Sequence, residues 1–252
     1  MTDEPNIIAL DGIGHRFGGL TVLRSVTFSI PDSGLVGLIG PNGSGKTTLF
    51  NIISGYLPLQ TGRIAFSGAP LTTQTVQDRS RAGMVRTFQT PKIFERMTVI
   101  ENVMVGACKL TRTGMLQDLL HSPRARSEMQ EIRTRAERVC ADLGLAGDLA
   151  ASTLPAGQRR ILEIARALVG EPRLLMLDEP SAGLNREEMR QLIAAIRRIN
   201  EQGLAILLVS HDMELMAVAE AVHVLNFGEI IARGDMAAIQ QNPNVREVYL
   251  GL

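Results

Sequence analysis

The sequence predicts an α/β fold built around a mostly parallel β-sheet. The strand-like run Leu35–Ile39 leads into a glycine-rich segment and then into a helical pattern. Leu174–Leu177 and Leu204–Val209 are continuous apolar runs, which are typical of parallel strands buried on both faces. Ile7–Phe17 and Leu20–Ile30 are predicted as a pair of β segments with partial period-two patterning, separated by Gly18-Gly19.

The glycine-rich segment Gly40–Thr47 matches the phosphate-binding pattern GxxxxGK[ST] at every fixed position. Its glycines let backbone N–H groups approach a phosphate, and the following helix adds the partial positive charge of its N-terminus. Lys46 is expected to reach the β- and γ-phosphates, and the Thr47 hydroxyl to bind Mg²⁺. A chance match is the alternative, which the placement between a strand and a helix argues against. The predicted phosphate ligands are Gly40, Pro41, Asn42, Gly43, Ser44, Gly45, Lys46, Thr47 and Thr48.

Length and composition describe an ordinary packed protein. The 252 residues suffice for one large α/β domain or for one domain with a substantial insertion. Lysine and arginine number 26 and aspartate and glutamate also 26, so global charge does not favour nucleic acid as a partner. Cys108 and Cys140 lack metal-ligand spacing and are expected to be small buried hydrophobes in a reducing compartment. No signal peptide or membrane-spanning run is visible, which predicts a soluble cytoplasmic protein.

The remaining chain is predicted mainly from its periodicity and its helix-ending residues. Thr98 is expected to cap a helix with Glu101 at its third position, and Gly55 to end the first helix. From Arg112 to Arg138 the composition shifts to a helical insertion that is broken at Pro123; its arginines fit a solvated helix face. The predicted helices are Thr48–Ser54, Val76–Ala82, Thr98–Val105, Ser127–Leu143, one opened by Leu154–Gln158, Arg186–Asn200 and a tail Met236–Leu250. The predicted further strands are Arg63–Phe66, Met84–Phe88, Val222–Leu225 and Glu229–Ala232.

Several side chains at predicted strand ends are candidates for chemistry. Asp178 could hold Mg²⁺ and Glu179 could act as general base on an attacking water, because ligands bind at the carboxyl ends of parallel strands. A helix cap and a surface acid are the alternative, which is weak because the same chain carries a phosphate loop. Gln89 could bind Mg²⁺ or orient a water, or could be a surface amide. His211 could bond the γ-phosphate, although a lone histidine is more often structural. Phe17 could lie against a base, although a strand phenylalanine is more often a core residue.

The order of these pieces resembles that of the ATP-binding-cassette (ABC) ATPases, over essentially the whole chain. Each segment alone is a weak signal, but all of them in order are a strong one. The segments are the phosphate loop, Gln89, a helical insertion, Leu154-Pro155-Ala156-Gly157-Gln158 as the family's signature, Asp178-Glu179, Ser181-Ala182-Gly183-Leu184-Asn185 as its D-loop, and His211 as its switch histidine.

Within that family the chain is most similar to the ATPase subunits of branched-chain (hydrophobic) amino acid importers. The insertion at 112–138 is also similar. The resemblance makes Phe17 the adenine-contacting aromatic. It places Ala156, Gly157 and Gln158 against the γ-phosphate of ATP held by an opposite subunit. The residues that carry the subgroup likeness are Arg16-Phe17-Gly18-Gly19-Leu20, Val85-Arg86-Thr87-Phe88-Gln89, Met97-Thr98-Val99-Ile100-Glu101-Asn102-Val103 and Val248-Tyr249-Leu250-Gly251.

The chain departs from the family pattern at two positions. Pro155 stands where the signature usually has serine and supplies neither a hydroxyl nor an N–H, so the contact would fall to Ala156, Gly157 and the helix N-terminus. Asn185 replaces the usual aspartate of the D-loop, which weakens inference about communication between two sites. Relatives of the amino acid importer type tolerate both changes, so we interpret them as subgroup features.

The resemblance implies a P-loop NTPase core with a RecA-like sheet, an N-terminal antiparallel β subdomain and a helical signature subdomain, in a single domain 1–252. Residues of about 1–88 and 170–252 would form the core, and residues of about 90–169 the helical subdomain. ATP and Mg²⁺ are the implied cofactors, and catalysis would fall to Lys46, Gln89, Glu179 and His211. The implied partners are a second ATPase subunit, identical or not, membrane permease subunits and, indirectly, an extracytoplasmic substrate-binding protein. The implied place is the cytoplasmic face of the inner membrane.

The implied function is ATP-driven dimer closure coupled to import of branched-chain or hydrophobic amino acids. Pro91, Ile93 and Phe94 near Gln89 could dock a membrane-domain helix or could be plain core. The alternatives are a urea or amide importer, a lipid or lipopolysaccharide exporter, a soluble cassette in DNA repair or translation, and a small-molecule kinase. The short insertion and zero net charge argue against the soluble cassette in DNA repair or translation. A kinase would not explain His211 or the helix start at Gly157-Gln158.

Overall fold

The computed structural model describes residues 5–88, 92–107 and 123–250, with the side chains of 123–125 and 249–250 left undescribed. The chain divides into two compact units. Unit 1 comprises Met1–Arg86, Arg173–Ala182 and Ile196–Leu252, and unit 2 comprises Thr87–Pro172 and Gly183–Ala195. One helix, α7 (Arg186–Glu201), contributes residues to both.

Unit 1 contains the mostly parallel sheet that the apolar runs predict. Within the described residues its strand order is β10-β9-β3-β8-β7-β6, and β10 alone runs antiparallel to its neighbour. All five residues of β3 and of β8 are buried, as parallel strands covered on both faces require. The strands are β3 (Leu35–Ile39), β6 (Met84–Arg86), β7 (Leu174–Asp178), β8 (Ala205–Val209), β9 (Ala221–Asn226) and β10 (Glu229–Gly234).

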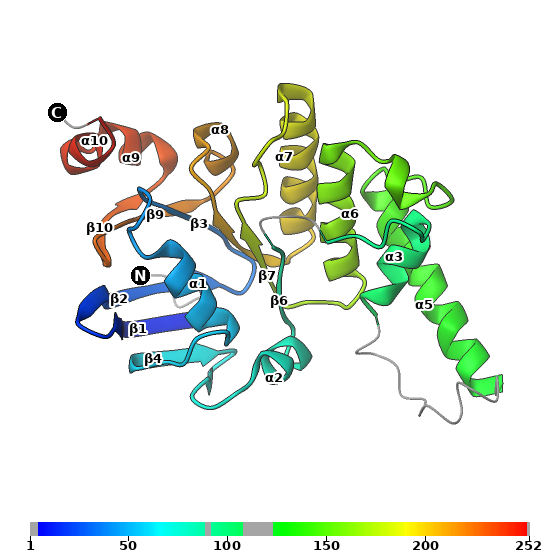
Figure 1. The fold of residues 1–252 in the computed structure, drawn as a ribbon, viewed down its shortest axis with the longest axis horizontal. Coiled ribbons are helices and arrows are strands. Elements are labelled where there is room, and N and C mark those ends of the chain that lie inside the picture. Colours follow the sequence, from blue (N-terminus) through cyan, green and yellow to red (C-terminus); the bar gives the residue numbers. More distant parts are fainter. Residues whose placement is uncertain (1–4, 89–91, 108–122, 251–252) are drawn as a thin grey trace. The chain divides into compact units, whose positions relative to one another are not determined.

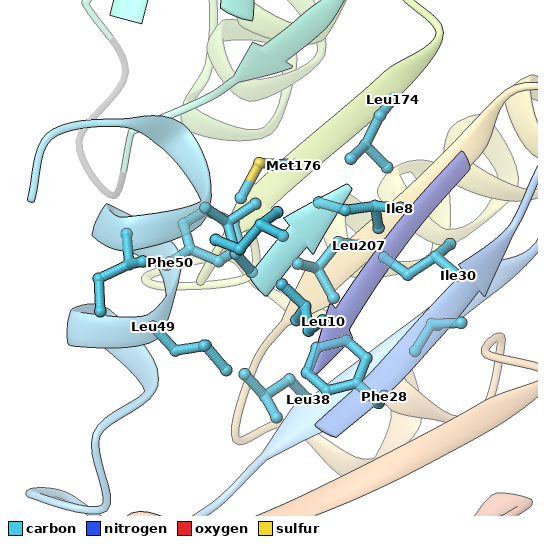
Figure 2. Packing of buried hydrophobic residues seen from close by; sticks show 14 of the residues in the cluster. Ile8, Leu10, Phe28, Ile30, Leu38, Leu49, Phe50, Leu174, Met176 and Leu207 are labelled. Atoms are coloured by element: carbon cyan, nitrogen blue, oxygen red, sulfur yellow. The ribbon is translucent and has the colours of Figure 1, made fainter. Parts of the chain in front are cut away.

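The second sheet of unit 1 is antiparallel, with the order β2-β1-β4-β5 in the described chain (Figure 1). Its inward side chains, including Ile8, Leu10 and Phe28, pack with Leu38 and Leu207 of the parallel sheet and with Phe50 in one apolar cluster (Figure 2). Burial of this apolar surface stabilises the two sheets against each other. The elements are β1 (Asn6–Phe17), β2 (Leu20–Pro31), β4 (Thr61–Phe66), β5 (Ala69–Pro70), α1 (Lys46–Ser54) and α2 (Val76–Arg81).

Unit 2 is helical, and in Figure 1 α3 (Val99–Val105), α5 (Pro123–Asp142) and α6 (Ala156–Leu168) lie side by side. A short 3₁₀ helix, Ala151–Thr153, precedes α6. Thr98 caps α3 in a reciprocal capping box with Glu101, as predicted. The helices share an apolar core of Val99, Val103, Ile132, Ala136, Cys140, Leu145, Leu154, Ile161, Leu162 and Ala165, among others.

These observations confirm the predicted fold class, and they correct several boundaries. The strand predicted to run through Phe88 ends at Arg86. Pro123, predicted to interrupt the helical insertion, instead begins α5, because proline at the first helical position loses no hydrogen bond. The tail is two helices, α9 (Met236–Gln241) and α10 (Pro243–Leu250), since Pro243 cannot continue α9. The short helix α8 (Met213–Met216) and strand β5 were not predicted. Cys140 is buried, as expected, and Cys108 lies outside the described residues.

Candidate functional site

Three neighbouring parallel strands of unit 1 end at the same level. Leu38 of β3 and Asp178 of β7 are both in register with Val209 of β8, which lies between them. The segments that follow β3, β7 and β8 therefore meet at one edge of the sheet, where ligands bind in α/β folds. This register brings together the phosphate loop, the Asp178-Glu179 pair and His211.

The glycine-rich loop runs from the end of β3 into α1, which begins at Lys46. Gly45 has a φ of 107°, a conformation that side-chain-bearing residues rarely adopt. A Cβ placed on Gly40 would lie 2.1 Å from the Leu225 carbonyl oxygen, so the chain has room only for glycine there. The ammonium of Lys46 donates to the carbonyls of Gly40 and Pro41, at 2.6 and 3.0 Å. The loop is thus folded into a ring around its own lysine.

The loop fits a phosphate group on two observations. The Ser44 hydroxyl is buried and has no hydrogen-bond partner in the described structure, so it can serve a ligand oxygen. Gly43, at a φ of 82°, faces open space, and Asn42, Gly43 and Thr47 are exposed. Burial lowers the pKa of Lys46, while the nearby carboxylates of Glu179 and Asp178 act to raise it. The lysine is therefore a charge held close to both acids.

Glu179 follows β7 in a strained backbone conformation, with a φ of 46° that few non-glycine residues adopt. Its amide donates to the Val209 carbonyl of β8 at 2.8 Å, which ties it to the neighbouring strand end. Its carboxylate Oε2 lies 2.8 Å from Nδ1 of His211, within hydrogen-bond distance. The side chain of His211 is 72% exposed and that of Glu179 16% exposed. Glu179 is therefore held in place by its own strand, β7, and by contacts with the end of the neighbouring strand, β8.

Asp178 is held by a residue that the sequence had not singled out for a role. Arg86, the last residue of β6, donates from Nη2 to Asp178 Oδ2 at 2.8 Å. Its other terminal nitrogen donates to Asn51 Oδ1 at 2.5 Å and to Ser54 Oγ at 3.1 Å, both on α1. The guanidinium also lies over the Phe50 ring. Arg86 thus joins β7 to α1, and no local sequence signal distinguishes it from the many surface arginines.

The signature segment lies in unit 2, at the start of α6. Pro155 is the residue before the helix and makes no side-chain cap. Ala156 is exposed, Gly157 is buried and Gln158 is half-buried. The predicted ligands of an opposite subunit's phosphate are therefore the first residues of a helix, as the sequence indicated.

Two buried charges of α6 hold the chain just before Gln89. Arg160 Nη1 donates to the Phe88 carbonyl at 2.7 Å and to Glu163 Oε2 at 3.0 Å, and the Phe88 amide donates to Glu163 Oε1 at 3.2 Å. Both side chains are 3% exposed. Burial raises the pKa of Glu163, and the Phe88 amide and Arg160 oppose that rise. Gln89 itself lies outside the described residues.

The structure also places the apolar candidates. Phe17 is 48% exposed at the end of β1 and makes a T-shaped ring contact with His15, so it is not a core residue. Phe94 is exposed, whereas Ile93 packs partly against the helical core of unit 2. Pro91 lies outside the described residues.

Solved structures share this fold. A crystal structure of an ATP-binding cassette of an ABC transporter in its ADP conformation superimposes with a TM-score of 0.85 at 30% identity, covering 98% of this chain and 99% of that one. A nucleotide-free ATP-binding cassette from an ABC transporter superimposes with a TM-score of 0.84, also at 30% identity, covering 98% of this chain and 100% of that one. The fold and the phosphate loop define an ATP-binding cassette.

The sequence comparisons define the family. The ABC transporter family model matches residues 23–182, and the model for the branched-chain amino acid ATP-binding cassette transporter matches residues 229–251. The chain is 39% identical over 249 residues to the high-affinity branched-chain amino acid transport ATP-binding protein LivG of Salmonella typhimurium, covering 97% of this chain and 98% of that protein. It is 37% identical to BraF of Pseudomonas aeruginosa, with the same coverage.

The chain belongs to the ABC transporter family, as a nucleotide-binding ATPase subunit of the branched-chain amino acid transporter group. The resemblance seen in its motifs is thereby confirmed. None of the described helices has the length and apolar character needed to cross a membrane.

Proposed function

We propose that this chain hydrolyses ATP to drive the import of branched-chain or other hydrophobic amino acids across the cytoplasmic membrane. The observation that carries the ATPase site is the register of β3, β8 and β7, which brings Lys46, Glu179 and His211 to one sheet edge. The C-terminal match at residues 229–251 and the names of the relatives support the choice of cargo.

ATP would be held through its phosphates by the loop Gly40–Thr48. The loop amides and the N-terminus of α1 would bind phosphate oxygens. Lys46 would exchange the Gly40 and Pro41 carbonyls for the β- and γ-phosphates, which are better partners for an ammonium group. Phe17, exposed at the end of β1, would contact the adenine.

The Thr47 hydroxyl, Asp178 and Gln89 would hold Mg²⁺ together with the phosphate oxygens. When bound, the ion neutralises charge that develops on the phosphates. Thr47 is exposed on the first turn of α1, and Arg86 fixes the orientation of Asp178. These residues supply the oxygen ligands that Mg²⁺ prefers.

Glu179 would act as general base by accepting a proton from the attacking water. Its strained backbone and its contact with His211 hold the carboxylate in one orientation, which general-base catalysis requires. His211 would also reach the γ-phosphate, since its side chain is largely exposed. Gln89 would orient the water.

A second ATPase subunit, identical or not, would complete each site. Ala156, Gly157 and Gln158 of one subunit would bind the γ-phosphate held by the other's loop, so that ATP closes the pair and hydrolysis reopens it. Permease subunits would dock near Phe94 and Ile93 of unit 2, placing the chain at the cytoplasmic face of the membrane. An extracytoplasmic substrate-binding protein would deliver the amino acid. The residues of about 90–169 would act as the helical subdomain.

The proposal is tested by isolating the tagged chain from detergent-solubilised membranes and identifying what accompanies it. We expect permease subunits, and we expect cells that carry Lys46→Ala to lose uptake of labelled leucine, because a phosphate-loop lysine is needed for ATP use. Uptake of urea lost in place of leucine would instead support an amide importer. Isolation without any membrane protein would contradict the transport function.

A further inference from the structure

One carboxylate in unit 2 joins the signature segment to the D-loop segment. Glu188, on the first turn of α7, accepts hydrogen bonds from two backbone amides: Oε1 from Gly157 at 2.9 Å, and Oε2 from Asn185 at 3.0 Å. The Asn185 side chain in turn accepts from the amides of Glu187 and Glu188, which begins α7. The bonds from Asn185 and Gly157 lower the pKa of Glu188, so it is a carboxylate at neutral pH.

Glu188 supplies the side-chain acceptor for the start of α6 that Pro155 cannot supply. The first amides of a helix have no partner within the helix, and a side chain of the preceding residue usually accepts from one of them. Pro155 has no such acceptor, and Gly157 is the second residue of α6. Glu188 therefore caps α6 from another segment of the chain.

The close approach of Glu188 depends on glycine at 157. A Cβ added to Gly157 would lie 2.7 Å from both Cβ and Cγ of Glu188, so a larger residue would push the carboxylate away. The signature glycine is thus matched to Glu188 within this chain.

The Gly157 amide cannot serve two anions at once. An N–H group donates one strong hydrogen bond, and a phosphate oxygen beside an ionised carboxylate would be repelled. We propose that Glu188 is a positioning residue that holds the Gly157 amide and the Asn185 segment together, and that an incoming γ-phosphate must displace it. This inference rests on the proposed role of Gly157 at the opposite subunit's ATP.

Displacement of Glu188 links the two segments to ATP binding. When the γ-phosphate takes the Gly157 amide, the Glu188 carboxylate gives up one of its two bonds, and the tie between Asn185 and α6 is released. Glu188 therefore sets the ATP concentration at which the pair of subunits closes. The intact contact favours the open pair.

The first test measures the ATP concentration for half-maximal ATPase activity. Glu188→Gln removes the competing charge, and Glu188→Asp keeps the charge but is too short to reach Gly157 while still able to pair with the Asn185 amide. Both should lower the half-maximal ATP concentration by about threefold to tenfold, the scale of one charge-assisted hydrogen bond at a partly exposed site, with kcat changed less than about twofold. An unchanged or higher half-maximal concentration in a folded variant would overturn the proposal.

The matched control is Glu187→Gln. Glu187 lies on the same turn and carries the same charge, but its carboxylate pairs with Arg190 and Gln191 and not with Gly157. It should leave both kcat and the half-maximal ATP concentration unchanged. An equal decrease in Glu187→Gln would mean that general surface charge is responsible, and would count against Glu188.

The second test does not depend on hydrolysis. Hydrogen exchange at the Gly157 amide should be at least about threefold faster in Glu188→Asp than in the unaltered chain, because the amide loses its acceptor. Equal exchange would overturn the contact whether or not the chain hydrolyses ATP. If the unaltered chain has no ATPase activity, the proposed function is contradicted. The exchange rate of the Gly157 amide tests the contact with Glu188 separately, because it does not require hydrolysis.

Discussion

The Glu179 carboxylate and the His211 imidazole meet across two neighbouring strand ends, 2.8 Å apart from Oε2 to Nδ1. Further hydrogen bonds anchor both residues. The Glu179 amide donates to the Val209 carbonyl, and the hydroxyl of Ser210, the residue before His211, lies 3.1 Å from the Ser181 hydroxyl. The pair therefore has one orientation relative to the phosphate loop. This orientation makes the general-base assignment testable.

Glu179→Gln should bind ATP but hydrolyse it at least about a hundredfold more slowly, because the amide cannot accept a proton from water. The variant should also accumulate an ATP-bound dimer. ATPase assays and size-exclusion chromatography with ATP measure these effects. Glu214→Gln, an exposed acid on α8, is the control and should behave as the unaltered chain. Turnover near the unaltered rate in Glu179→Gln would disprove the assignment.

Arg86→Ala should destabilise the fold. It removes the ion-pair partner of Asp178, which is 13% exposed, and leaves Asn51 without a donor from β6. We expect a loss of about 3 kcal/mol in unfolding free energy, the scale for breaking a mostly buried ion pair. Urea denaturation measures it. Arg81→Ala, at an exposed pair with Asp78, should change the free energy by less than about 1 kcal/mol. Equal effects from both variants would refute the bridging role of Arg86.

His223 should make the fold sensitive to mild acid. Burial, and secondarily the charge of Arg233, lowers the pKa of His223 to about 4, below the 6.5 of an unperturbed histidine. Falling pH therefore protonates the unfolded chain first. The stabilisation from neutral His223 is complete above pH 6.5 and is lost as the pH falls towards 4. Between pH 7 and pH 5, His223 should therefore lower the free energy of unfolding by about 2 kcal/mol.

His223→Phe should remove this part of the pH dependence while keeping a ring against Phe28. Urea denaturation at pH 7 and pH 5, with both proteins, measures the difference. Between pH 7 and pH 8 the two should show the same slope. A variant that loses as much stability as the unaltered chain between pH 7 and pH 5 would contradict the neutral, buried His223.

Pro155→Ser should preserve or raise ATPase activity. A serine before α6 gives the helix its own cap, and its hydroxyl could bond a phosphate of the opposite subunit. We expect about 0.5 to 1 kcal/mol of added stability by urea denaturation. Pro155→Ala, which removes the ring without adding an acceptor, is the control. A collapse of ATPase activity in both variants would show that the proline is itself required, and a collapse in the serine variant alone would contradict the prediction for serine.

Several parts of the site could be predicted from the sequence because they depend on local patterns. The phosphate loop requires glycines, lysine and a hydroxyl at fixed spacing, so Gly40–Thr47 was recognisable at once. The apolar runs before Asp178 and Ser210 predicted buried strands with polar side chains at their ends. The capping pair Thr98 and Glu101 was likewise visible, because its partners are three residues apart.

Local sequence patterns indicate which residues can act, whereas the folded chain selects the residues that come into contact. Arg86 reaches Asp178 across 92 positions of sequence, and Glu188 reaches Gly157 across 31. Such contacts follow from strand order and helix packing, not from spacing, so arginine and glutamate at these positions look like any surface charge. Local motifs such as the phosphate loop can be recognised from the spacing of a few residues. Long-range hydrogen bonds form only when packing of the core brings distant helices and strands together.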